Sequence, residues 1–228
     1  MATIRKPRAG VIARCLAPAL VLAVLSGSPA TAAQPAALVE DVSGKLAGVA
    51  VMDYLDRGRT VDLAPGQVLT LSYLASCTYE RITGGTVTVG MRESAVAGGS
   101  VERRQMPCDG GSLLLAAGEA DKAGVSVFRD GAIALAGSLP RAQVTLFRTK
   151  PVLVLGKPGR VVFERLDSPD QPLEVEVPAR TRDLAKDGPA LKPGGLYRVR
   201  NGDRSLVVKV DPGAGASGGP ALGRLIRF

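Results

Sequence analysis

An alternation of apolar and polar residues constrains the fold of this 228-residue chain more than any other feature. It is clearest in "VLTLSY" (68–73), "TVTVGM" (86–91) and "LEVEV" (173–177). Successive side chains of a β-strand point to opposite faces, so these segments predict strands with one buried face. The residues expected on the buried faces are Leu69, Leu71, Tyr73, Val87, Val89, Met91, Leu173, Val175 and Val177.

Turn sequences between further segments of this kind predict antiparallel pairing. The "RDG" at 129–131 lies between "VSVF" and "AIALAG", and the "NG" at 201–202 lies between "LYRVR" and "SLVVKV". Asp-Gly and Asn-Gly pairs supply the positive φ angles of tight hairpins. A helical turn is indicated only at 113–124, "LLLAAGEADKAG". The sequence therefore predicts an all-β fold with mostly antiparallel sheets.

The first 33 residues have the layout of a cleaved secretory signal peptide. A basic start is followed by the apolar run Cys15–Leu25 and by small residues at 30–33. This run is shorter than the roughly 18 to 20 residues that a membrane-spanning helix needs. We expect the mature chain to begin between Ala33 and Pro35, to lack a transmembrane segment and to be periplasmic.

The composition argues against several classes of function. The signal peptide holds four of the 29 basic residues and no acidic one, so the net charge falls from +8 to +4 on cleavage. The remaining basic residues are scattered and the chain has few aromatic residues, so we expect no nucleic-acid binding. The chain has no His, which removes the usual general base and the commonest metal ligand. We therefore expect a protein that is not an enzyme and that has no catalytic residue, cofactor or metal.

A change in composition near Thr149–Pro151 predicts a division of the mature chain. Residues 34–149 are rich in Gly and hold both mature cysteines, whereas residues 150–228 hold short strands with frequent Pro. We expect two small β-modules with these boundaries. One continuous sandwich is the alternative.

Cys77 and Cys108 are the only cysteines left after cleavage. Two thiols in an exported chain normally form a disulfide, and this pairing is our prediction. The competing interpretation is a nucleophilic Cys77 with Arg81 lowering its pKa, but no His is present to activate the thiol.

Two further patterns carry catalytic residue types. The segment "GASGGP" (215–220) is similar to the nucleophile segment of trypsin-like serine proteases, but Ser217 lacks the His that this mechanism requires. Asp53, Asp56 and Asp62 lie close together in the sequence and motivate the alternative of a carboxylate-dependent envelope hydrolase. A linker around Ser217 and a polar loop around the aspartates are the preferred interpretations.

"LKPGGLYRV" (191–199) resembles the corner motif of fibronectin type III and related immunoglobulin-like sandwiches. In that motif the Tyr hydroxyl bonds to the backbone and fixes the corner before a strand. The resemblance implies that Leu191 lies in the core, that Pro193 makes the turn and that Tyr197 is buried.

The N-terminal module resembles the periplasmic FecR-type β-domains of Gram-negative bacteria. The resemblance rests on "VSGKLAGVAV", "RGRTVDLAPGQVLTL" and "ITGGTVTVG", in this order. It implies a module for sensing or scaffolding, with an envelope protein or polymer as partner. We therefore expect a non-catalytic binding, sensing or scaffolding protein of the cell envelope.

Overall fold

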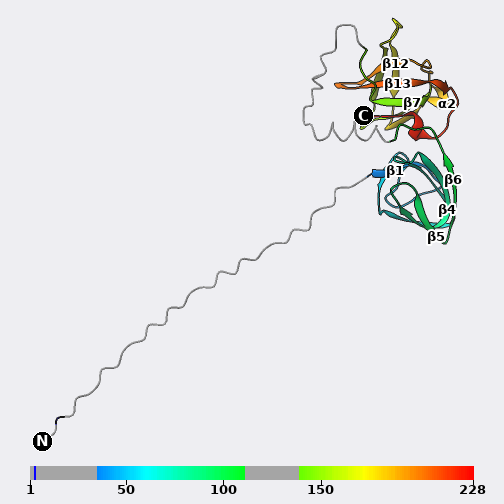
Figure 1. The fold of residues 1–228 in the computed structure, drawn as a ribbon, viewed down its shortest axis with the longest axis vertical. Coiled ribbons are helices and arrows are strands. Elements are labelled where there is room, and N and C mark those ends of the chain that lie inside the picture. Colours follow the sequence, from blue (N-terminus) through cyan, green and yellow to red (C-terminus); the bar gives the residue numbers. More distant parts are fainter. Residues whose placement is uncertain (1–2, 4–34, 111–138) are drawn as a thin grey trace. The chain divides into compact units, whose positions relative to one another are not determined.

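Strands make up almost all regular structure in the computed structural model, which describes residue 3 and residues 35–110 and 139–228 (Figure 1). The predicted all-β class is confirmed. The signal peptide, the helical turn at 113–124 and the hairpin around 129–131 lie outside the described residues. No helix in the described ranges is long and apolar enough to cross a membrane.

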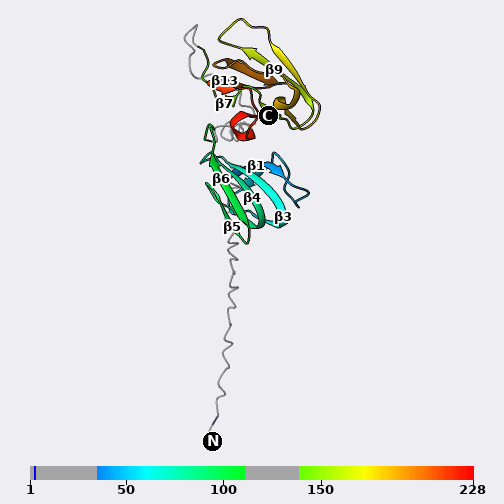
Figure 2. The same cartoon turned by 90° about the vertical axis from the view of Figure 1, so that its right-hand side faces the viewer.

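The first sheet is antiparallel throughout and runs in the order β2-β1-β3-β4-β5, with β6 also paired to β4 (Figure 2). Its inward side chains form one hydrophobic core that includes Leu69, Leu71 and Ile82, all fully buried. The strands are β1 (Pro35–Val42), β2 (Tyr54–Asp56), β3 (Thr60–Tyr73), β4 (Thr78–Val89), β5 (Ser94–Ala97) and β6 (Ser100–Gln105).

Glycines allow two segments of this sheet to approach each other closely. A Cβ at Gly85 would lie 2.4 Å from the Ala97 carbonyl oxygen, and one at Gly99 would lie 2.0 Å from the Gly84 carbonyl oxygen. The close approach of β4 to the turn between β5 and β6 therefore requires glycine. Past this point the buried positions of β4 shift from even to odd residue numbers.

The C-terminal strands form two sheets around a second core. A five-stranded sheet runs β10-β9-β12-β13-β7 and a three-stranded sheet runs β11-β8-β14 (Figure 1). The pairs β13–β7 and β14–β8 are parallel and the other pairs in these sheets are antiparallel. The prediction of mostly antiparallel sheets is therefore confirmed. The elements are β7 (Val144–Arg148), β8 (Val152–Val154), β9 (Gly159–Arg165), β10 (Leu173–Val177), β11 (Thr181–Asp183), α2 (Leu184–Asp187), β12 (Leu196–Asn201), β13 (Arg204–Gly215), the 3-10 helix η1 (Ala221–Arg224) and β14 (Leu225–Arg227).

The two sets of strands contact each other, because the described residues 35–110 and 139–228 belong to one compact unit. The second core includes Leu38 and Leu74 from the first set. The Glu40 carboxylate of β1 accepts hydrogen bonds from the backbone N–H groups of Ala221 and Leu222 in η1. Strand β7, which precedes the expected boundary, pairs with β13. The division at residues 149 and 150 stays a prediction.

The hairpin expected around the Asn-Gly pair is present, with the loop one residue later than expected. Asn201 is the last residue of β12 and pairs with Arg204, so Gly202 and Asp203 form the loop. Gly202 has a φ of +57°, whereas Asn201 and Asp203 have negative φ angles. Only the glycine therefore uses the left-handed region.

Two expectations about strand faces were wrong. Met91 lies beyond the end of β4 and is 40% exposed, because the chain turns where the Gly90 N–H bonds to the Glu93 carbonyl. Thr70 and Ser72 alternate with the apolar residues of "VLTLSY" and so belong to its expected polar face, but both are buried. The Ser72 hydroxyl donates to Glu40, the same carboxylate that binds η1.

The small-residue segment 211–223 is a linker only at residues 216–220, around Ser217, because its first residues belong to β13 and its last residues to η1. Strand β13 continues to Gly215, where the Thr149 N–H donates to the Gly215 carbonyl. The following turn, η1, is buried throughout. Ser217 itself is exposed between these two elements.

Candidate functional site

The outer face of the β4–β6 strand pair carries a polar concavity of about 260 Å³, here called the β4–β6 groove. It is lined by Tyr79, Arg81, Glu102, Arg103 and Arg104. The pairing of the strands sets these side chains together, since Tyr79 lies opposite Arg104 and Arg81 lies opposite Glu102. The alternate residues of β4 in this stretch are buried on the other face of the sheet.

Two of the arginine side chains in the groove, Arg104 and Arg81, differ in their contacts. The Arg104 guanidinium lies 4.1 Å from the centroid of the Tyr79 ring, a cation–π contact that holds both side chains in place. The Arg81 side chain has no hydrogen bond or ion pair to another described residue. Its five donors are therefore available to a carboxylate or phosphate.

The buried carboxylate of Glu80 lies on the opposite face of the strand pair from the groove. Glu80 is fully buried and accepts hydrogen bonds from the Arg103 Nε at 2.7 Å and from the Ser94 N–H at 3.1 Å. The Arg103 guanidinium also donates to the Ser94 carbonyl at 2.6 Å. The Ser94 hydroxyl lies 2.7 Å from the Tyr73 hydroxyl, and burial raises the pKa of that phenol to about 12. This network joins β3, β4, β6 and the start of β5.

The predicted disulfide is present at the end of the same strand pair. Cys77 and Cys108 are bonded across 31 residues, with their Cα atoms 5.6 Å apart. The Met106 N–H donates to the Cys77 carbonyl at 3.0 Å and extends the pairing of β4 with β6. The bond thus fixes the strand pair that carries the groove, and it occupies the thiol of the nucleophilic interpretation.

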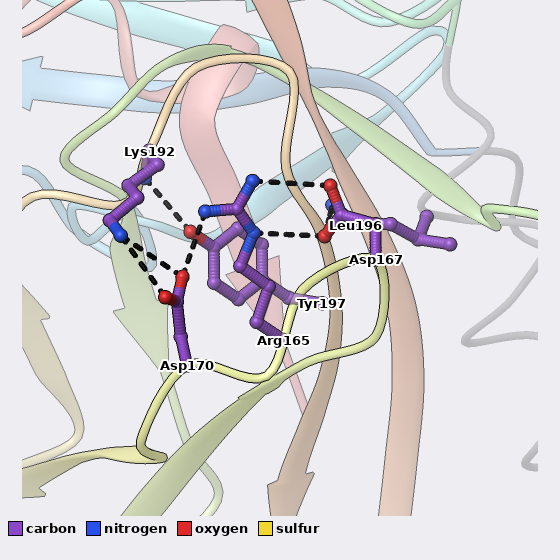
Figure 3. A network of polar contacts seen from close by, with 6 residues as sticks. All are labelled: Arg165, Asp167, Asp170, Lys192, Leu196 and Tyr197. Carbon is purple, nitrogen blue, oxygen red and sulfur yellow. Dashed lines mark hydrogen bonds and ion pairs between the residues drawn. The ribbon is translucent and has the colours of Figure 1, made fainter.

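The Tyr197 hydroxyl of the corner motif is bound to the backbone five residues earlier in the chain (Figure 3). Tyr197 is 6% exposed, and its hydroxyl accepts a hydrogen bond of 2.9 Å from the backbone N–H of Lys192. Leu191 is buried in the second core, and Pro193 precedes Gly194, which has a φ of +76°. These contacts support the core, and no residue of the corner lines the groove.

An ion-pair network ties the loop after β9 to this corner (Figure 3). Arg165 binds Asp167 at 2.9 Å and Asp170 at 2.8 Å, and Asp170 also accepts from the Lys192 ammonium at 3.1 Å. Arg165 and the Leu196 N–H hold the pKa of Asp167 at about 2, below its usual value of 3.8. The hydrogen bonds from Lys192 and Arg165 lower the pKa of Asp170 in the same way. The network is structural, because its charges satisfy one another.

Two of the three aspartates in the hydrolase alternative have side-chain partners of their own. Asp53 binds Arg180 at 3.0 Å, and Asp62 accepts from the Thr86 hydroxyl at 2.7 Å. Asp56 ends the short strand β2. Among the described residues no group of three or more Cys, Asp or Glu side chains could hold a metal ion. These contacts supply no argument for paired catalytic carboxylates.

Sequence reasoning named Arg81 only as a neighbour that could lower the pKa of Cys77, and it did not single out Tyr79 or Arg104. The segment that includes Arg103 and Arg104 reads only as scattered surface charge until its pairing with β4 is known. The buried positions of "TYERIT" do alternate, and this was the available signal, whereas "SVERRQ" is exposed at every position except Val101. No family model, curated protein or solved structure matches the chain.

Proposed function

We propose that this chain is a non-catalytic, exported β-protein that acts as a binding module in the cell envelope, with the β4–β6 groove as its binding surface. One observation carries the proposal. Arg81 lines the groove together with the stacked Tyr79 and Arg104 side chains, and it has no ion-pair partner among the described residues.

The chemistry of the groove favours an anionic or hydroxyl-rich ligand. Arginine binds carboxylate and phosphate groups through paired hydrogen bonds. Glu102 adds an acceptor for a hydroxyl or amide group of the same ligand. An acidic polymer or an acidic protein surface of the envelope has this chemistry.

The contacts that hold β4 and β6 together favour binding without rearrangement of these strands. The Glu80–Arg103 ion pair and the Cys77–Cys108 disulfide fix the two strands before a ligand arrives. A surface that is already ordered loses less conformational entropy on binding. This property suits a sensing or scaffolding module, which is also what the resemblance to FecR-type domains implies.

Export to the periplasm is part of the proposal. It is supported by the signal-peptide pattern in residues 1–33 and by the disulfide, which is a bond of oxidising compartments.

Capture from fractionated envelope tests the proposal. Immobilised mature protein is incubated separately with purified cell-wall polymer and with solubilised envelope proteins. Arg81→Glu reverses the charge at the centre of the groove, and Lys209→Glu is the matched control because Lys209 is exposed on β13, in another sheet. We expect wild type and the control to retain a ligand that Arg81→Glu loses. Equal retention by all three proteins would contradict the proposed surface.

A further inference from the structure

Strand β6 is an edge of the first sheet. It pairs with β4 along one side, and no strand in the described ranges pairs with its other side. All its residues are exposed except Val101, which is half-buried. An open edge of this kind presents backbone donors and acceptors that can pair with another strand.

The pairing with β4 determines which backbone groups face outward. The Met106 N–H donates to the Cys77 carbonyl, so this opposed pair is a hydrogen-bonded one. Hydrogen-bonded and non-hydrogen-bonded pairs alternate along an antiparallel ladder. The N–H and C=O groups of Val101, Arg103 and Gln105 therefore point away from β4, toward the open side.

We propose that β6 is a self-association edge, at which two copies of this chain pair antiparallel about a two-fold axis at Arg103. In this register Arg103 faces Arg103 of the second copy, and Val101 faces Gln105 of the second copy. All the outward groups then meet, which gives about six backbone hydrogen bonds. The proposal does not depend on the ligand of the groove.

The charges of Glu102 and Arg104 favour this register over the registers shifted along the strand. It places Glu102 opposite Arg104 of the second copy, and Arg104 opposite Glu102 of the second copy. These are non-hydrogen-bonded pairs, in which side chains approach most closely. A shift that keeps the backbone bonding would set Glu102 against Glu102, or Arg104 against Arg104. Like charges directly opposite are destabilising, so only the proposed register is complementary.

The two Arg103 side chains do not oppose the pairing. Each guanidinium turns back to Glu80 at 2.7 Å, with Glu93 at 3.5 Å, so its charge is neutralised inside its own copy. Glu102 and Arg104 differ, because neither forms an ion pair with another described residue. Their charges are available to the second copy.

Sedimentation equilibrium of the mature protein tests the inference, and wild type is expected to dimerise reversibly. Glu102→Arg and Arg104→Glu each replace two opposite-charge pairs with two like-charge pairs, so each should weaken dimerisation about 30-fold. The double variant with both changes exchanges the charges, so it should dimerise within about threefold of wild type. Lys209→Glu should leave dimerisation unchanged.

Gln105→Pro tests the backbone pairing. Proline removes an N–H that faces the open side and leaves the ladder to β4 intact, as proline does on edge strands. We expect this variant to be monomeric with the circular dichroism of wild type. The inference is overturned by wild-type protein that stays monomeric at every concentration, by a double variant that is no tighter than either single variant, or by a Gln105→Pro dimer as tight as wild type.

Discussion

Substitution of Tyr197 separates two contributions to the stability of the C-terminal strands. The hydroxyl accepts one hydrogen bond, from the Lys192 N–H at 2.9 Å. Tyr197→Phe removes this bond at a partly buried site, so we expect a loss of about 1 kcal/mol in the free energy of unfolding. Tyr197→Ala also removes a ring that is 6% exposed, and the resulting cavity should bring the loss to roughly 3 to 5 kcal/mol.

Gly195 provides an independent check on the position of this ring. A Cβ at Gly195 would lie 2.6 Å from Cε2 of Tyr197, so Gly195→Ala should destabilise wild type by about 1 to 3 kcal/mol. The same change should cost less in the Tyr197→Ala background, where the ring is absent.

Urea unfolding followed by circular dichroism measures each free energy. Tyr79→Phe is the matched control, since the Tyr79 hydroxyl has no hydrogen bond to another described residue. Its stability should change by less than about 0.5 kcal/mol. If Tyr197→Ala unfolded at the same urea concentration as wild type, the ring would not be buried. This result would contradict the assignment of Tyr197 as the buried tyrosine of the corner motif.

Three further predictions concern the disulfide, the ion pairs and export. Double substitution of Cys77 and Cys108 by Ala should lower the free energy of unfolding by about 3 to 4 kcal/mol, because the bond closes a 31-residue separation; free thiols in protein purified from the periplasm would contradict the pairing. The lowered pKa of Asp167 stabilises the fold above pH 3.8, and this stabilisation is lost as the pH falls toward about 2. The stability difference between wild type and Asp167→Asn, measured by urea unfolding, should therefore shrink over this range, and a constant difference would refute the ion-pair assignment. Mass spectrometry of the periplasmic protein should find an N-terminus between Ala33 and Pro35, and an intact Met1 would refute signal cleavage.

The sequence predicts those parts of the fold that depend on neighbours along the chain. Val175 and Val177 are buried as their alternation indicates, because β10 has one covered face. Gly202 forms a hairpin because its own backbone freedom allows the turn. The Tyr197 contact spans five residues, so a local motif is enough to indicate it.

Features that depend on distant segments were not predictable in this way. The buried Ser72 hydroxyl donates a hydrogen bond to Glu40, which is 32 residues away in the sequence. Glu40 in turn binds Ala221, which is 181 residues from it. The groove arises because the Tyr79 and Arg104 side chains meet across a strand pair, and no periodicity within one strand reveals its partner. The candidate site is therefore determined by the pairing register of the strands, which composition does not indicate.

Hydrogen exchange of the protein alone and with its captured ligand tests the binding surface most directly. The account predicts slower exchange on ligand addition at the Tyr79–Arg81 and Glu102–Arg104 peptides, which form the β4–β6 groove. Exchange in β9 and β10, which belong to another sheet, should be unchanged. Protection confined to the C-terminal strands, with none in β4 or β6, would contradict the assignment of the groove as the binding site.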